Sequence, residues 1–127
     1  MNFLNKAQII GNVTRDPDIR QTKAGQPVTT IGVATNRRFR DASGEVREEA
    51  EFHNVVCWGK LAELAEKYLR KGSKIGVVGA IQQQRWEKDG KKFSKVIVNV
   101  DQLEFLDTKK KEESKNDVDD DDFPWMD

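Results

Sequence analysis

The sequence predicts an all-β fold, a small barrel with one helix, followed by an acidic tail that cannot build a core. Two observations concern the barrel. Segments rich in β-branched residues alternate with turn signals, and a single segment after Gly59 spaces its apolar residues as a helix does. The third concerns the tail, because residues 107–122 contain no aromatic residue and one large apolar residue, Val118. The 127 residues therefore divide into one domain over residues 1–106 and an appendage.

The first half of the chain has the character of successive strands. Residues 5–14 carry a β-like apolar stretch that ends at a proline-containing turn signal, and a short strand over residues 19–22 follows. The β-branched segment 28–36 and the segment 51–58 are the next two predicted strands. Between them, residues 37–50 are polar and charged, which predicts a long loop or a loose hairpin tip.

The helix signal begins directly after Gly59. Apolar residues recur at i, i+3, i+4, i+7 and i+8, which makes one stripe at helical spacing. Arg70 and Lys71 favour the last turn of a helix, and Gly72 is the predicted stop. The stripe consists of Leu61, Leu64, Ala65, Tyr68 and Leu69.

Two further strands complete the domain. Residues 73–85 and 93–105 are strand-like, and Asp89 and Gly90 between them are a hairpin signal. The main strands and the helix thus follow the order of three strands, one helix and two strands. This is the order of the OB-fold, a five-stranded, partly open barrel with one helix between strands 3 and 4.

The charges of the chain separate into two opposite parts. Residues 1–111 contain 21 Lys and Arg against 14 Asp and Glu, or 21 − 14 = +7, and residues 112–127 contain one Lys against eight carboxylates, or 1 − 8 = −7. This asymmetry is typical of a body that binds a polyanion and a tail with a separate task. We also expect the tail to compete with the polyanion for the basic body at low salt.

The tail itself predicts two segments. Residues 107–118 are a disordered charged linker, because they cannot bury enough surface to offset the entropy of ordering. Residues 119–127 are an acidic tip that contains one Phe and one Trp. A solvated tail gains nothing from exposed aromatic side chains, so these two are expected to bind in a pocket of a partner protein. The predicted partner-binding residues are Asp119, Asp120, Asp121, Asp122, Phe123, Pro124 and Trp125.

The residues available for catalysis argue against an enzyme. His53 and Cys57 lie four apart in a predicted strand, about 13 Å apart at about 3.3 Å per residue, which is too far for a nucleophile–base hydrogen bond. A packed histidine and a buried thiol are expected instead. The chain has too few Cys and His for a zinc site and no phosphate-cradling glycine loop, so no metal or cofactor is expected.

The same composition predicts a cytoplasmic protein. No apolar run approaches the roughly 20 residues needed to cross a bilayer. The N-terminus lacks the pattern of a secretory signal, and the single cysteine excludes an internal disulfide.

Four aromatic residues are candidates for stacking on nucleic-acid bases. Phe52 and Trp58 share one face of their predicted strand, Phe39 lies among arginines, and Trp86 lies at a strand end between basic residues. Burial of a ring among cations would bring charges inside, whereas an exposed ring can stack on any base while the cations meet phosphates. Three other aromatic residues, Phe3, Phe93 and Phe105, are instead expected to pack within the fold.

At this point the residues resemble a known family, the bacterial-type single-stranded DNA-binding proteins. Residues 59–63 together with residues 68–72 are the most specific block, and the aspartates before Pro124-Trp125 are the second signature. Further matches lie at residues 5–6, 11–12, 16–17, 39–41, 44–45, 51–53 and 55–56.

The resemblance implies an OB-fold that assembles as a homotetramer and wraps single-stranded DNA without catalysis. It implies a nucleoid-associated protein that coats and protects single-stranded DNA and recruits replication, repair and recombination proteins through its tail. The family's four stacking positions fall on Phe39, Phe52, Trp58 and Trp86. Its phosphate-contacting positions carry over to Lys6, Arg20, Lys60, Lys71 and Arg85, beside Arg37 and Arg38 next to Phe39.

Two alternatives stay open from the residues alone. An RNA-binding OB-fold protein of the cold-shock or translation-factor kind would use the same rings and cations. A primosome-type interaction module with weak nucleic-acid binding is the other, although four exposed aromatics argue against it.

Overall fold

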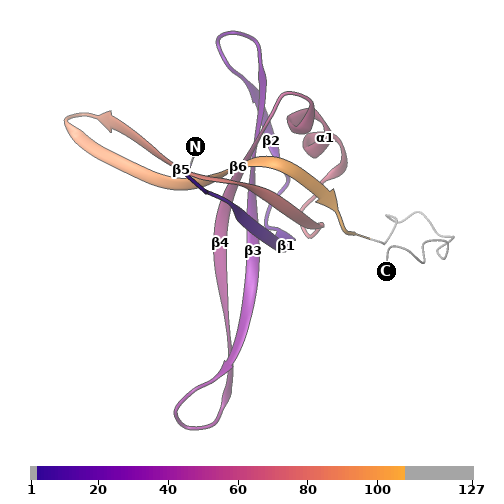
Figure 1. Ribbon diagram of the computed structural model, residues 1–127, viewed down its shortest axis with the longest axis vertical. Helices are drawn as coiled ribbons and strands as arrows, with labels where there is room; N and C mark the ends of the chain where they lie inside the picture. Colours follow the sequence, from indigo (N-terminus) through magenta and orange to yellow (C-terminus); the bar gives the residue numbers. More distant parts are fainter. Residues whose placement is uncertain (1–2, 108–127) are drawn as a thin grey trace, which may run out of the picture.

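A computed structural model describes residues 3–107, which form six strands and one helix (Figure 1). The fold is all-β apart from the helix, as the sequence predicts. The elements are β1 (Ala7–Val13), β2 (Asp18–Gln21), β3 (Pro27–Arg40), β4 (Val46–Trp58), α1 (Lys60–Tyr68), β5 (Lys74–Lys88) and β6 (Lys91–Phe105).

The strands form a closed barrel. Their order is β1-β5-β6-β4-β3-β2, and an additional pairing of β1 with β3 closes the sheet on itself. The short strand β2 extends the sheet beyond β3, so five strands make the barrel wall. In chain order these five are β1, β3, β4, β5 and β6, with α1 between the third and the fourth. The predicted OB-fold is confirmed.

The barrel interior is filled by alternate residues of each strand. In β3, Thr29, Ile31 and Val33 are buried, and their partners on β4 include the fully buried Cys57 and Val55. Small residues of α1 close one end of the core, where Ala62 accepts a hydrogen bond of 2.8 Å from the Thr29 hydroxyl. The core consists of Val13, Ile31, Val33, Val55, Cys57, Ala62, Ala65, Leu69, Ile75, Val77, Val98 and Val100.

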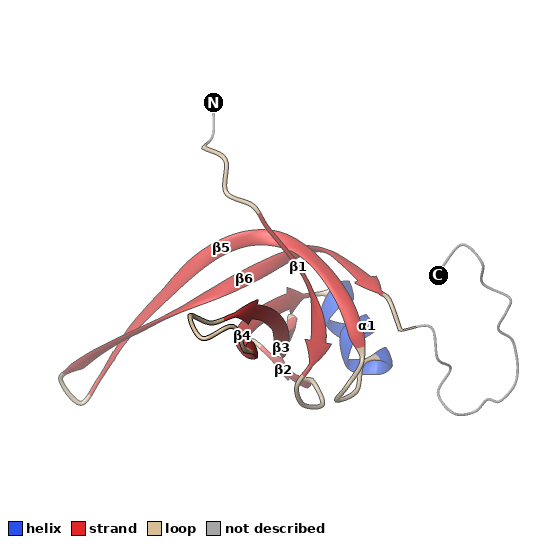
Figure 2. Cartoon of the chain, turned by 90° about the horizontal axis from the view of Figure 1, so that it is seen from below, coloured by secondary structure: helices blue, strands red, loops and turns tan. Residues whose placement is uncertain are grey.

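Two long hairpins extend beyond the barrel in different directions (Figures 1 and 2). We call residues 37–51 the β3–β4 arm and residues 85–95 the β5–β6 arm. Of the two alternatives predicted for residues 37–50, the long loop is wrong and the hairpin is present, because β3 and β4 stay paired as far as Arg40 and Val46. Only residues 41–45 form the turn. An arm that is solvated on both faces needs no apolar alternation, so the usual sequence signal of a strand is absent.

The helix is shorter than predicted. It ends at Tyr68, because Leu69 takes an extended conformation with φ −98° and ψ 145°. Gly72, the predicted stop, lies in the following turn with φ 94°. The buried side chains near the helix are Ala62, Ala65 and Leu69, and Tyr68 is exposed. Of the predicted stripe, Leu61, Ala65 and Leu69 pack in or against the core; Ala62 joins them and Tyr68 does not.

The turn of the β5–β6 arm follows the sequence signal. Asp89 and Gly90 both have positive φ, 52° and 76°. Two such residues are what a two-residue type I′ turn requires, and the turn brings Lys88 opposite Lys91. This register fixes which side chains meet along the whole arm.

Candidate nucleic-acid interface

Three predicted stacking residues lie on the outer surface of the barrel and its extension. Phe52 and Trp58 occupy even-numbered positions of β4, so their side chains lie on the outer face, opposite to the inward-facing Val55 and Cys57. Trp86 is opposite Phe93 in the β5–β6 register, on the face that continues through Asn99. We call Phe52, Trp58, Trp86 and Phe93 the ring face; these side chains are 73%, 40%, 45% and 41% exposed.

Trp58 is held at its edge by a neighbouring strand. Its indole Nε1 donates a hydrogen bond of 3.0 Å to Oδ1 of Asn99 on β6. The amide nitrogen of Asn99 in turn donates to Oε1 of Gln82 on β5. Parallel pairing of β4 with β6, which aligns Val56 with Asn99, brings these side chains together on the outer surface.

Part of the outer surface between the strands is closed. Val56 and Ile97 point outward by register, but both are buried. Neighbouring side chains must therefore cover them, and the surface beside Trp58 has an apolar floor.

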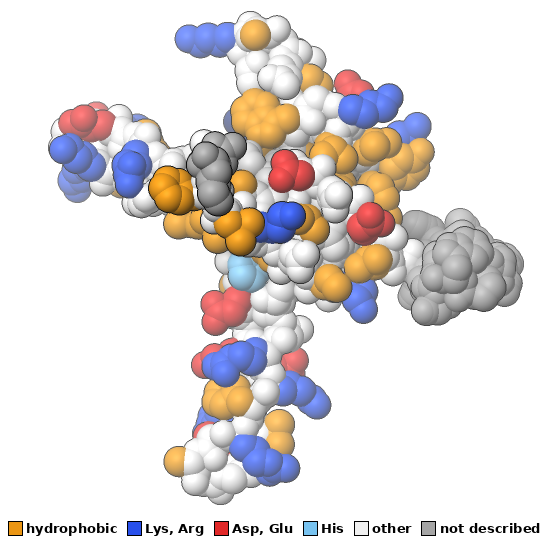
Figure 3. All heavy atoms as spheres, viewed as in Figure 1, with side chains coloured by type: hydrophobic (Ala, Val, Ile, Leu, Met, Phe, Trp, Pro, Cys, Tyr) orange, Lys and Arg blue, Asp and Glu red, His pale blue; other side chains and the backbone are white. Residues whose placement is uncertain are grey.

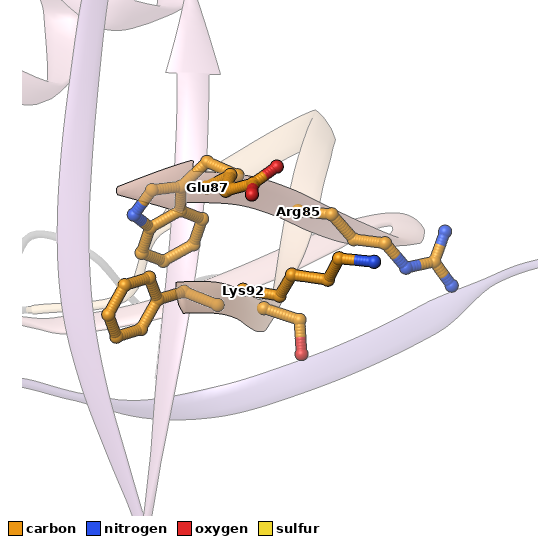
Figure 4. Close-up of a pocket in the computed structure, with 6 residues that line it drawn as sticks. Arg85, Glu87 and Lys92 are labelled. Carbon is orange, nitrogen blue, oxygen red and sulfur yellow. The ribbon is translucent and has the colours of Figure 1, made fainter. Parts of the chain in front are cut away.

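Phe93 is a member of the ring face that sequence reasoning assigned to packing. It stacks on Trp86 with ring centroids 5.6 Å apart and an interplanar angle of 20°. The pair borders a hollow of about 470 Å³ (Figure 4), lined by Arg85, Trp86, Glu87, Lys92, Phe93 and Ser94. The signal that could have found Phe93 is the Asp-Gly turn, since counting back from it pairs residue 93 with residue 86.

Phe39 does not join the other three predicted rings. It lies opposite Arg47 in the β3–β4 register and has the parity of the inward-facing Ile31 and Val33. It is half-buried, and the Arg37 guanidinium lies over its ring at 4.5 Å from the centroid. The arm therefore presents Phe39 on the face opposite to Phe52.

The other two aromatic residues assigned to packing differ from each other. Phe3 is 98% exposed, so it makes no packing contact of consequence within this chain. Phe105 packs edge-on against Tyr68 of α1, with ring centroids 5.9 Å apart.

The predicted phosphate-contacting residues are distributed around the ring face. Arg20 on β2 is in register with Val28, which in turn pairs with Trp58, so Arg20 lies two strands away on the same face. It is ion-paired with Asp18 at 3.2 Å, with both side chains largely exposed. Lys60 opens α1 two residues after Trp58, and Lys71 follows the helix in a turn.

Three arginines of the arms have mixed orientations. Arg38 shares the parity of Phe52, whereas Arg37 has the parity of Phe39 and forms an ion pair of 3.0 Å with Glu49. Arg85 points away from Trp86, and its guanidinium donates to Gln83 at 2.8 Å. Figure 4 shows Arg85 and Lys92 extending their charged ends toward the same side of the arm.

Lys6 is placed by its neighbour. The Asn5 side-chain amide donates to the carbonyl oxygen of Ile81 at 2.8 Å and accepts from the Ile81 N–H at 2.9 Å. Asn5 thereby continues the β1–β5 ladder beyond Ala7 and keeps Lys6 beside the base of the β5–β6 arm.

The two arms differ in charge. The β3–β4 arm has four arginines against five carboxylates, or 4 − 5 = −1, and Figure 3 shows the two signs interspersed along it. The β5–β6 arm has five Lys and Arg against two carboxylates, or 5 − 2 = +3. The aromatic pair of Trp86 and Phe93 thus lies on the positively charged arm.

The tip of the β3–β4 arm is organised by one carboxylate. Asp41 accepts hydrogen bonds from the Arg47 side chain at 2.6 Å, from the Ser43 hydroxyl at 2.7 Å and from the Glu45 N–H at 3.0 Å. These bonds lower the pKa of Asp41 from 3.8 to about 2, and the bond from Arg47 has the largest effect. A fixed ion pair at the tip leaves Arg47 less available to an outside anion.

His53 and Cys57 do not form a reactive pair. Cys57 is buried in the barrel, and burial raises the pKa of its thiol from 9.0 to about 12. His53 Nε2 lies 2.9 Å from the Thr35 hydroxyl at the base of the β3–β4 arm. A protonated thiol in the core has no nucleophilic role at neutral pH.

Residues 3–107 contain no group of three or more His, Cys, Asp or Glu side chains suited to hold a metal ion. Within the same range, no helix is long and apolar enough to cross a membrane. The linker over residues 108–118 and the predicted partner-binding residues 119–125 lie outside the described part of the chain.

The closed five-stranded barrel, its helix and the rings on its outer surface define the class of OB-fold proteins. Comparison with known proteins specifies the family. The chain belongs to the single-strand binding protein family, whose family model matches residues 4–106.

Individual relatives agree with this assignment. The chain is 41% identical over 101 residues to single-stranded DNA-binding protein 1 of Chlorobaculum tepidum. The aligned region covers 77% of this chain and 62% of that protein. It is 42% identical over 106 residues to the single-stranded DNA-binding protein of Helicobacter hepaticus, covering 83% of this chain and 62% of that protein. The match thus spans less than two thirds of the length of these two relatives.

Solved structures also resemble the chain. A Plasmodium falciparum SSB complex with single-stranded DNA superposes with a TM-score of 0.77 at 30% identity, over 84% of this chain and 98% of that one. A deletion mutant of the single-stranded DNA binding protein from Thermus aquaticus gives a TM-score of 0.73 at 36% identity, over 82% and 51% of the two chains.

Proposed function

We propose that this chain binds single-stranded DNA without sequence preference, coats and protects it, and catalyses no reaction. The observation that carries the proposal is the ring face, with Phe52, Trp58 and Trp86 exposed on one side of the barrel and its extension. Membership of the single-strand binding protein family and the likeness to a complex with single-stranded DNA support it.

Stacking on the rings supplies the preference for unpaired bases. Each stacked base contributes about 1–3 kcal/mol, and every base has a π-face, so the sequence matters little. Bases of a duplex already stack on one another and present only their edges. The ring face therefore favours single strands over duplexes.

Cations around the rings meet the phosphates. The β5–β6 arm, with its charge of +3, carries Arg85 and Lys92 one residue away from the Trp86–Phe93 pair, on the opposite face of the arm. Arg20, Lys60 and Lys6 extend the contact area along the barrel, and Arg37, Arg38 and Lys71 are the other proposed phosphate contacts. Binding through such contacts weakens as salt rises, with a slope of about −0.7 per phosphate neutralised on a single strand.

Phe39 is the fourth proposed stacking residue. Its face differs from that of Phe52, so a bound strand would have to cross the edge of the β3–β4 arm to reach it. The Arg37 guanidinium lies over this ring, so a base would stack on the opposite face or displace the guanidinium.

A titration of tryptophan fluorescence tests the proposal. The chain is titrated with oligo-dT, oligo-U and duplex DNA at a low and a high salt concentration. We expect quenching and tight binding with oligo-dT and weak binding with the duplex, and a negative salt slope. Equal affinity for duplex and oligo-dT would overturn the stacking model, and a preference for oligo-U would favour an RNA-binding protein.

We further propose that the chain assembles as a homotetramer. Residues 7–11 of β1 pair with β5 along one edge only. The apolar side chains of Phe3, Leu4 and Ile10, in and before this strand, are strongly exposed, and this is the surface on which another copy of the chain would pack. Light scattering measures the mass directly, with and without a long oligonucleotide. A monomer mass at micromolar concentration would contradict the assembly.

The tail is proposed to recruit proteins of replication, repair and recombination through residues 119–125. Its Phe123 and Trp125 would fill an apolar pocket on the partner while the aspartates meet cations at the rim. A pull-down with the unaltered chain and with Trp125→Ala tests this, since the variant should lose partners that the unaltered chain retains.

A further inference from the structure

The hydrogen-bond chain at Trp58 has only one possible direction. An indole N–H can donate but not accept, so the Asn99 atom that faces it must be the oxygen Oδ1. The Asn99 amide nitrogen is then turned toward Gln82 and donates to its Oε1. One donor on Trp58 therefore sets the orientation of two amides on two other strands.

This contact is made at the edge of the indole and not at its face. An edge contact restricts rotation of the ring about its side-chain bonds without covering the surface on which a base would stack. Trp58 stays 40% exposed while its nitrogen is satisfied. Pre-organisation of this kind lowers the entropy lost when a ligand is bound.

We propose that Asn99 is a positioning residue, which holds the Trp58 indole in the orientation that stacks on a base, with Gln82 fixing the Asn99 amide. The proposal rests on the proposed function, because it assigns Asn99 a role in binding single-stranded DNA. It concerns the side chain alone, since the backbone of Asn99 pairs with Ala80 and Val56 whatever its side chain is.

A double-mutant cycle separates this role from a general structural one. The affinity for oligo-dT is measured for the full chain, Asn99→Ala, Trp58→Phe and the double variant. Phenylalanine keeps a ring but has no N–H, so it cannot use Asn99. Gln102→Ala is the matched control, because Gln102 is an exposed amide on the outer face of β6 without a contact to a ring of the ring face.

We expect Asn99→Ala to weaken binding about threefold to tenfold, the range for ordering one side chain on binding, and less than about twofold when Trp58 is already Phe. Gln102→Ala should leave the affinity unchanged, and every variant should remain folded at the temperature of the titration. An equal loss in both backgrounds, or no loss in either, would overturn the positioning role.

A second measurement works without DNA. In a chain whose Trp86 and Trp125 are replaced by Phe, Trp58 is the remaining tryptophan, and its anisotropy under selective excitation of tryptophan reports ring mobility. Asn99→Ala should lower this anisotropy, and an unchanged value would refute the restraint. If the unaltered chain fails to bind oligo-dT, the proposed function fails, while the anisotropy still decides whether Asn99 holds the ring.

Discussion

Gly79 lies where two strands of the barrel come unusually close. A Cβ built on Gly79 would overlap the carbonyl group of Asn99 on β6. The close approach accompanies a register shift between Val78 and Gly79, where β6 contains the unmatched residue Asp101. A β-bulge of this kind bends the strands, and the absence of a side chain allows it.

A substitution at Gly79 should therefore destabilise the barrel. We expect Gly79→Ala to lower the free energy of unfolding by about 1–3 kcal/mol, the usual cost of overpacking. Gly76→Ala on the same strand is the matched control, because its Cβ would meet Leu106 Cδ1 at 3.4 Å, an ordinary contact. Urea denaturation of both variants checks this, and equal stabilities would contradict the steric argument.

The sequence predicted individual residues well where a register could be counted. Phe52 and Trp58 lie on one face of a strand whose alternation is clear, and the structure keeps both exposed. Phe39 lies in a segment interpreted as a loop, for which no parity exists, so its opposite orientation could not be foreseen. Phe93 was missed because its partner is set by a turn several residues away.

The two arms are elements with different chemistry. Ion pairs cross the β3–β4 arm from Arg37 to Glu49 and from Arg47 to Asp41. The β5–β6 arm instead pairs Trp86 with Phe93 and carries most of its charge as lysine. We infer that the β3–β4 arm pairs part of its own charge, whereas the β5–β6 arm leaves a net charge of +3 for an anion.

The turn of the β3–β4 arm should resist acid. Asp41 binds Arg47, Ser43 and Glu45 in its ionised form, with a pKa of about 2 against 3.8 ordinarily. These bonds are present above pH 3.8 and are lost as the pH falls through about 2. We expect the amide resonance of Ser43, whose N–H donates to Asp41 at 2.9 Å and whose side chain does not titrate in acid, to keep its position down to about pH 3.

Asp41→Asn supplies the control for this titration. The variant lacks the Asp41 carboxylate, so the Ser43 amide resonance should be shifted at neutral pH and should lack the acid transition. A midpoint near 3.8 in the unaltered chain would show that the hydrogen bonds do not persist in solution.

The stacked pair on the β5–β6 arm should act as one platform. Phe93→Ala removes the ring that supports Trp86, and we expect the affinity for oligo-dT to fall by an amount within the range of one stacked base, about 1–3 kcal/mol. Phe105→Ala is the matched control, since it is a Phe of the same strand and of equal exposure that packs on Tyr68. Equal effects of the two substitutions on the fluorescence titration would argue against the platform.

At the scale of the whole molecule, the opposite charges of body and tail should oppose each other. We expect a chain that ends at Lys111 to bind oligo-dT more tightly than the full chain at low salt. The advantage should vanish at high salt, because screening acts on both attractions. Binding isotherms of the two chains at two salt concentrations measure this, and identical low-salt affinities would refute the competition.

The order of the elements could be predicted from the sequence, whereas the shape could not. Turn signals and the helical stripe are local, so the strand, helix and barrel assignments follow from short windows. The closure of β1 on β3 and the length of the arms depend on contacts between distant residues. A single amino-acid sequence contains no direct signal for these long-range strand pairings.

The parallel contact of β4 with β6 joins only Val55 with Val98 and Val56 with Asn99 among the described residues. Those few bonds bring the tryptophan of one hairpin beside the amides of the other, across the crossover that contains the helix. No peptide cut from either hairpin would keep this arrangement. Recognition of a nucleotide at that seam would then be inseparable from completion of the barrel, and a bound strand would protect the seam from local opening.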